Sequence, residues 1–164
     1  DVSITGLITE SAIGDEFGYQ LDGNTRLINA SVTINSSGND APASLVTSCE
    51  DLHQIADEVE SYEGVLVKLN NVTVSAVNQY DWAITDASGF EALIDDDMAT
   101  MEADNMMSTL AEGQELEYVM GVFNFSYGTY KVQIRDESDL GSMGEVNNDI
   151  EINPYEYALY NNFS

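Results

Sequence analysis

Three consecutive aspartates, Asp95-Asp96-Asp97, form the most compact cluster of metal-ligating groups in the chain. Carboxylate oxygens are the ligands that Ca²⁺ prefers in proteins. The cluster lacks the spacing and the glycine of an EF-hand loop. The same acids could instead cap the helix that the following residues predict and interact with its dipole. We therefore predict Asp95, Asp96 and Asp97 as metal ligands, with Ca²⁺ as the only cofactor considered, and keep helix capping as the alternative.

A cysteine and a histidine stand four residues apart at Cys49 and His53, and each is the sole residue of its type. On a helix that spacing could pair a nucleophile with a base. The alternative is a buried cysteine beside a surface histidine. One cysteine excludes an intrachain disulfide within this sequence. No Gly-x-Ser-x-Gly, Walker or Rossmann motif is present. The sequence therefore predicts a protein that is not an enzyme, with no catalytic residues.

Aromatic residues gather in the second half of the chain and could stack on bases or sugars. Alternation along a strand places Phe123 and Phe125 on one face. The alternative is that these rings fill the core. The predicted ligand or stacking surface consists of Tyr80, Trp82, Phe125 and Tyr127.

The charge of the chain restricts its partners. Its 164 residues include 30 acidic and only 4 basic ones, which gives a net charge of -26. Proteins that hold nucleic acid neutralise phosphates with Lys and Arg, so a nucleic-acid partner is disfavoured, and so is an anionic membrane surface. The 43% hydrophobic content is enough for a core. No apolar run approaches the roughly 18 residues of a membrane span. The first residues lack a signal-peptide pattern, so we expect any signal peptide to be already removed.

The N-terminal third predicts β-structure followed by a short helix. Residues 1–47 contain apolar runs at 2–8, 17–21 and 27–34, and we interpret them as a β-strand annex. Residues 48–61 predict a helix or linker, because Leu52, Ile55, Ala56 and Val59 are spaced i, i+3, i+4, i+7. Ser48 and Asp51 resemble a capping box.

Residues 62–140 predict a second unit with a definite order of elements. Strands are expected at 65–74, 82–85, 90–94, 116–125 and 130–134. A helix after Asp97, ending before Gly113, should bury Ala99, Ala103, Met106, Met107 and Leu110. The fold class is therefore mainly β. A five-stranded barrel with a helix between its third and fourth strands is the order of an oligonucleotide/oligosaccharide-binding (OB) fold. Residues 141–164 are expected to form an extended C-terminal tail.

Several segments resemble OB-fold domains of secreted bacterial proteins, which occur beside extracellular endonuclease/exonuclease/phosphatase-type nucleases. The similar segments lie within about 62–140 and are mainly turns and core: residues 62–67, 71–74, 86–89, 94–98, 121–128 and 130–135. Residues 1–47 resemble the last two strands of a preceding OB unit whose first three strands are absent, which would leave strand edges unpaired.

The tail resembles a secretion signal. Residues 154–163 are similar to the start of the C-terminal sorting domain of type IX secretion substrates. That resemblance implies a bacterial protein located outside the cell or on its surface. The chain also holds five Asn-x-Ser/Thr sequons, which would carry glycans only in a suitable host. They begin at Asn29, Asn35, Asn71, Asn124 and Asn162.

Two functions are consistent with these patterns. The first is a non-catalytic structural subunit of an extracellular filament or surface assembly, a homo-oligomer or polymer built by strand exchange between acidic subunits. Cations would screen the acidic subunits from one another. The alternative is an accessory OB domain that binds a glycan or another ligand for a larger secreted hydrolase or adhesin. The predicted assembly strands contain Ile4, Leu7, Ile8, Tyr155, Tyr157, Leu159 and Tyr160.

Overall fold

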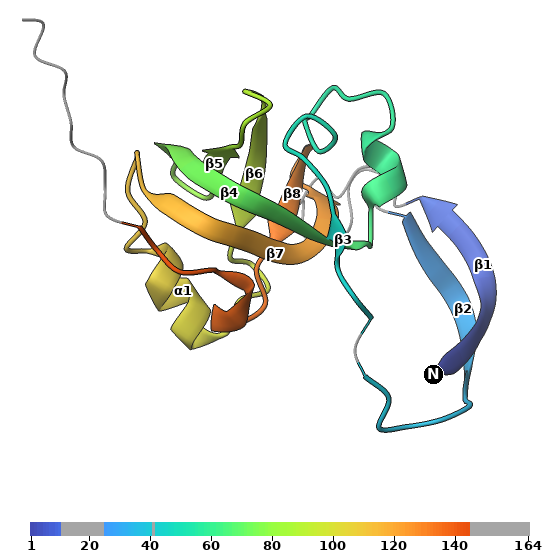
Figure 1. Cartoon of the computed structure of the whole chain (residues 1–164). Coiled ribbons are helices and arrows are strands. Elements are labelled where there is room, and N and C mark those ends of the chain that lie inside the picture. Colours follow the sequence, from blue (N-terminus) through green and yellow to red (C-terminus); the bar gives the residue numbers. More distant parts are fainter. Residues whose placement is uncertain (11–24, 41, 145–164) are drawn as a thin grey trace, which may run out of the picture.

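The computed structural model describes residues 1–10, 25–40 and 42–144 (Figure 1). The protein is mainly β, with 46% strand and 11% helix, as the sequence predicts. The predicted strand at 17–21 and the predicted assembly residues Tyr155, Tyr157, Leu159 and Tyr160 lie outside the described residues. Within the described part of the chain, no helix is long and apolar enough to cross a membrane.

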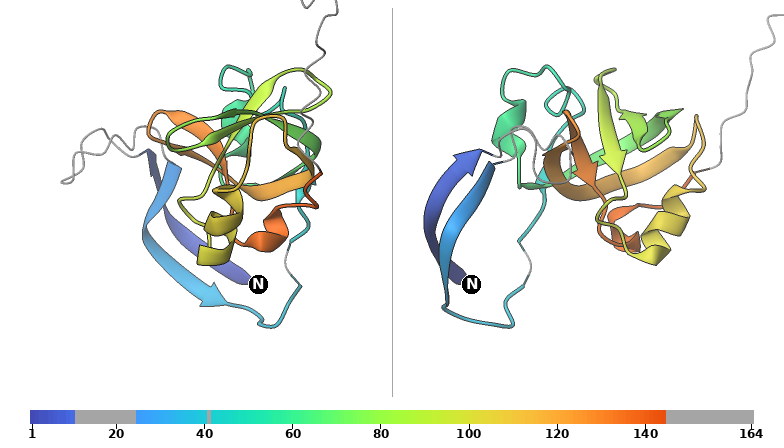
Figure 2. Two further views of the ribbon diagram at one scale, coloured as in Figure 1. Left: turned by 90° about the vertical axis from the view of Figure 1, so that its left-hand side faces the viewer. Right: turned by 180° about the vertical axis from the view of Figure 1, so that it is seen from behind.

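A six-stranded sheet contains the main core. Its strand order is β3-β4-β5-β6-β8-β7. The last strand of this order, β7, also pairs with the second strand, β4. Figures 1 and 2 show these strands wrapping around a common interior. Val67, Leu69 and Phe123 are among the fully buried side chains that fill it. The strands are β3 (Leu45–Val46), β4 (Leu66–Val77), β5 (Trp82–Thr85), β6 (Glu91–Asp95), β7 (Glu115–Ser126) and β8 (Thr129–Gln133).

Helix α1 (Met101–Met107) follows β6 and precedes β7 in the chain. The predicted apolar face is buried at Ala103, Met107 and Leu110. The N-cap is Thr100, whose hydroxyl accepts the Ala103 N–H at 3.3 Å. Capping by the preceding aspartates is therefore wrong, because the chain makes a turn after β6 before the helix begins. The 3₁₀ turn η2 (Glu137–Asp139) follows β8.

The predicted helix over 48–61 does not form. The capping box does form, because the Asp51 N–H donates to the Ser48 hydroxyl at 3.3 Å and the Ser48 N–H donates to the Asp51 carboxylate at 3.3 Å. The segment then continues as turns and ends in the 3₁₀ helix η1 (Val59–Tyr62). Leu52 is fully buried but Ile55 is 83% exposed, so the apolar spacing does not produce one continuous buried face.

This irregular segment covers an open seam of the sheet. Strands β6 and β8 pair only at Ile94–Val132 and Asp95–Gln133. Before that point in β8, the side-chain amide of Gln54 donates to the Tyr130 carbonyl at 2.7 Å and accepts the Tyr130 N–H at 2.8 Å. Gln54 thus supplies the two hydrogen bonds that a neighbouring strand would make.

Strands β1 (Val2–Glu10) and β2 (Thr25–Ile34) form a separate antiparallel pair. Figures 1 and 2 show this hairpin beside the larger sheet, on the side opposite α1. A register shift between Thr5 and Leu7 absorbs one extra residue of β2, and Asn29 there adopts φ 51°. Gly6 fits at this point because an added Cβ would lie 3.2 Å from the Ile28 carbonyl oxygen.

Candidate functional site

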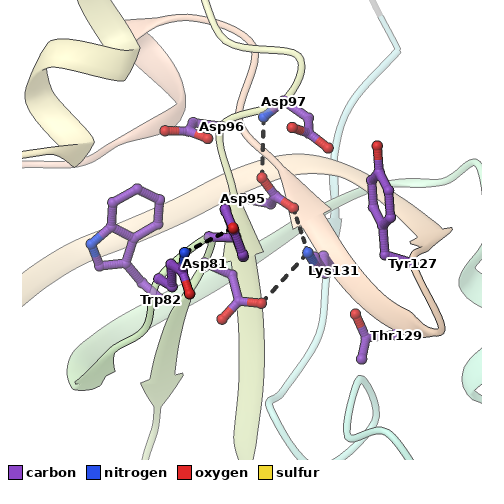
Figure 3. Close-up of a pocket in the computed structure, with 10 residues that line it drawn as sticks. Asp81, Trp82, Asp95, Asp96, Asp97, Tyr127, Thr129 and Lys131 are labelled. Carbon is purple, nitrogen blue, oxygen red and sulfur yellow. Dashed lines mark hydrogen bonds and ion pairs between the residues drawn. The ribbon is translucent and has the colours of Figure 1, made fainter. Parts of the chain in front are cut away.

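A cavity of about 710 Å³ opens where β5, β6 and β8 meet the β4–β5 and β7–β8 loops (Figure 3). It brings together three of the four predicted aromatic residues and all three predicted metal ligands. Phe125 does not line it, and its ring lies 4.7 Å from that of Tyr130. The lining residues are Gln79, Tyr80, Asp81, Trp82, Asp95, Asp96, Asp97, Tyr127, Thr129 and Lys131.

A buried ion-pair network forms the floor of the cavity. The Lys131 Nζ lies 2.7 Å from Asp95 Oδ2 and 3.5 Å from Asp81 Oδ2. The side chains of Lys131 and Asp95 are only 5% and 2% exposed. Burial opposes the charged ammonium, but the hydrogen bond and negative charge of Asp95, together with Asp81, outweigh it and raise the pKa of Lys131. Lys131 therefore remains a cation in the fold.

The three aspartates lie close enough to share an ion. One oxygen from each lies within 4.8 Å of the others. Asp95 already accepts hydrogen bonds from Lys131 and, at 3.2 Å, from the Asp97 N–H, as Figure 3 shows. A cation bound here would therefore compete with Lys131 for Asp95.

Burial and neighbouring carboxylates raise the pKa values of Asp96 and Asp97. Burial, a hydrogen bond to Asp104 and the charges of Asp104 and Asp95 raise the pKa of Asp96 to about 6. Burial and the charge of Asp95 also raise the pKa of Asp97, against the opposing effect of Lys131. Burial is the largest cause of both shifts, and the neighbouring carboxylates add to it. The cavity would attract a ligand that carries positive charge.

The aromatic side chains stand on opposite sides of this charged floor. Figure 3 shows Trp82 on one side of Asp95 and Tyr127 on the other. Tyr80 and Tyr127 are 73% and 54% exposed, whereas Trp82 is half-buried and packs against the core. Lys131 Nζ lies 6.0 Å from the centre of the Tyr127 ring. The exposed rings of Tyr80 and Tyr127 can contact a ligand, whereas Phe123 belongs to the core.

Cys49 and His53 do not form a reactive pair. The Cys49 thiol is fully buried and lies 3.7 Å from the Ile84 carbonyl oxygen. Burial and the charge of Asp86 raise its pKa to about 12, whereas a nucleophilic cysteine needs a low pKa. The His53 ring packs edge-on against Phe90 at 5.4 Å.

Sequence reasoning missed the two residues that organise the cavity, Lys131 and Asp81. A lone lysine between Tyr130 and Val132 in a strand suggests an exposed position. The scarcity of basic residues could have indicated them. The chain has only four basic residues and 30 acidic ones, so a lysine inside an apolar strand is expected to pair with acids.

The hairpin is a second candidate site. Its register places Val2, Ile4 and Ile8 on the same face as their partners Ile34, Val32 and Leu27. These six aliphatic residues, here called the apolar hairpin face, are each 47–76% exposed. The predicted assembly residues Ile4 and Ile8 belong to this face. Leu7 lies on the other face of the hairpin, where its cross-strand partner is Ile28 and its neighbours are Ser and Thr residues.

Comparisons of the chain with protein-family models, with curated proteins and with solved structures find no match.

Proposed function

We propose that this protein is a non-catalytic, secreted bacterial subunit of an extracellular filament or surface assembly, and that its β1–β2 hairpin is the assembly surface. In this proposal β4, β5, β6, β8 and β7 form an OB barrel, with α1 between its third and fourth strands. The observation that carries the proposal is the apolar hairpin face, which is exposed to solvent in the single chain.

An isolated two-stranded hairpin is marginally stable in water. Contiguous exposed apolar surface of this kind typically marks an interaction site. Burying the exposed part of six aliphatic side chains contributes on the order of 6 kcal/mol, before the cost of association. A partner on this face would therefore stabilise the hairpin and be held by it.

The distribution of charge supports the same surface. Residues 2–9 and 27–36 contain no charged side chain, although the whole chain carries -26. Two copies that approach through other surfaces bring like charges together. Contact through the hairpin avoids this repulsion. Added salt or Ca²⁺ should favour assembly further by screening the repulsion that remains between the acidic surfaces.

A pair of threonine substitutions tests the proposal. Ile4→Thr with Val32→Thr keeps β-branched side chains but makes the apolar hairpin face polar. Thr5→Ala with Ser31→Ala is the matched control on the opposite face. We expect negative-stain images and light scattering to show assemblies for the wild type and the control, and monomers for the threonine variant. A wild-type protein that stays monomeric with and without millimolar Ca²⁺ would refute the proposal.

The cavity favours a second candidate function, an accessory ligand-binding OB domain. OB folds bind oligosaccharides and oligonucleotides at the loops after the first and fourth strands. Here those loops contribute Tyr80 and Tyr127 to one cavity. Trp82 is the sole tryptophan, so its fluorescence reports on the cavity. Quenching or a blue shift on titration with soluble oligosaccharides, lost in Tyr80→Ala, would support this function. An unchanged spectrum across the panel would count against glycan binding.

A further inference from the structure

We propose that the β1–β2 hairpin of one copy receives residues Tyr155–Tyr160 of a second copy as a strand added to its edge, which extends the apolar hairpin face. This inference rests on the proposed function and names the partner segment. Both strands of the hairpin offer an outer edge, because the two-stranded sheet formed by the described residues contains only β1 and β2. An extended peptide binds such an edge through its backbone and gains specificity from alternate side chains.

The segment has the alternation that this docking needs. In a strand Tyr155, Tyr157 and Leu159 point to one side, and Glu156 and Ala158 to the other. Placed along the edge of β1, the first set would extend the row of Val2 and Ile4. Glu156 would then lie on the other face of the hairpin, that of Thr5 and Leu7, where its carboxylate stays in water.

Charge favours the same pairing. Residues 152–164 contain one acid, Glu156, and no base. The strands of the hairpin are uncharged over residues 2–9 and 27–34. Joining these two weakly charged segments lets the acidic barrels of neighbouring copies remain apart.

The position of the described chain end makes the contact head-to-tail. The Gly144 N–H donates to the Glu115 carbonyl at 2.8 Å, at the start of β7. Figure 1 and the right-hand view of Figure 2 show that end of the described chain on the side of the larger sheet opposite the hairpin. The ten residues 145–154, which precede the docking segment, span at most about 36 Å. The C-terminal segment on one side of a copy and the hairpin on the other side then form a heterologous contact. Such a contact propagates into an open filament unless the rotation between copies closes a ring.

Cysteine crosslinking between different chains tests the inference. Cys49 does not compete, because it is fully buried and its thiol has a pKa of about 12. A full-length Tyr157→Cys chain is mixed with Ile4→Cys or with Val32→Cys, one for each edge, and oxidised. Thr5→Cys, on the opposite hairpin face, is the matched control. Affinity tags of different size identify mixed dimers on gels.

We expect Ile4→Cys or Val32→Cys to form several-fold more mixed dimer with Tyr157→Cys than Thr5→Cys does. The Glu156→Cys chain should show the reverse preference, which argues against non-specific contact of the tail. Dimers within Ile4→Cys alone, without mixed dimers, would mean that hairpins pair with each other and would overturn the inference. A chain that carries both Ile4→Cys and Tyr157→Cys and forms only an intrachain disulfide would also overturn the inference.

The proposed function can survive the failure of this inference. Assemblies that disappear in the Ile4→Thr and Val32→Thr variant but persist after deletion of residues 150–164 would leave the hairpin as the assembly surface with a different occupant. A wild-type chain that is monomeric under all conditions would overturn both proposals. Circular dichroism and Trp82 fluorescence verify that each variant keeps its barrel.

Discussion

Replacing Lys131 by methionine should destabilise the fold more than any other loss of a single charge at the cavity. Its Nζ lies 2.7 Å from Asp95 and 3.5 Å from Asp81. At an effective dielectric constant of about 20, these distances correspond to gross attractions of about 6 and 5 kcal/mol. Most of this attraction compensates for desolvation. Removing one partner leaves the buried Asp95 carboxylate unpaired, which costs about 3–5 kcal/mol.

Urea unfolding followed by Trp82 fluorescence measures this loss. Lys131→Met should lower the free energy of unfolding by about 3–5 kcal/mol at pH 7. The double variant Lys131→Met with Asp95→Asn should recover a substantial part of this loss, because the fully buried carboxylate of Asp95 is then replaced by a neutral amide and only Asp81, whose side chain is 17% exposed, keeps an unpaired charge. Lys68→Met is the matched control, since this lysine lies over the Tyr118 ring at 3.7 Å and is only half-buried. Its loss should stay below about 1 kcal/mol.

The reasoning about this ion pair would be refuted by either of two results. One is a loss below about 1 kcal/mol for Lys131→Met, which would show that solvent compensates Asp95. The other is a double variant that is no more stable than the single one. In that case the lysine would contribute through packing of its methylene groups rather than through its charge.

Two further variants test other parts of the structure. The pKa of Asp96 is raised to about 6, so the folded state binds a proton more tightly than the unfolded state, and this group makes stability increase as pH falls from about 6 to 4. Asp96→Asn should remove that slope and stabilise the protein at pH 7 by on the order of 1 kcal/mol, in thermal melts measured across pH; an unchanged slope would contradict the assignment. Gly121→Ala should disrupt the β7–β8 ladder, because the added Cβ would meet the Gln133 carbonyl group; a melting temperature equal to the wild type's would contradict the packing described.

The regular elements of residues 62–140 could be predicted from their side chains. Trp82–Thr85 is a strand with the predicted bounds, and α1 buries the predicted Ala103 and Met107. Local periodicity is sufficient there because each element has one side facing a single core. The cap of α1 could not be placed, because three aspartates and Thr100 are all competent N-caps and only the turn after β6 decides between them.

The loop 48–61 and the cavity depended on long-range contacts. Leu52, Ile55 and Val59 have helical spacing, yet the segment follows the seam of the sheet so that Gln54 reaches Tyr130. The acid triad was found from sequence, but its neutralising partner Lys131 comes from β8, 36 residues away from Asp95. Periodicity carries no information about such pairings.

The side chain of Gln54 has a consequence for how the six-stranded sheet opens. At Tyr130, β8 pairs with β7 on one edge, whereas on the edge toward β6 the side-chain amide of Gln54 takes the place of a strand partner. Local opening of residues 53–58 would release both bonds at once, without breaking any strand pairing and with Cys49 and Leu52 still buried. Hydrogen exchange at the Tyr130 amide should therefore report a low-energy opening of the seam, well below the free energy of global unfolding. The sheet is therefore expected to open first at that seam, and a single side chain, Gln54, sets the position of the seam.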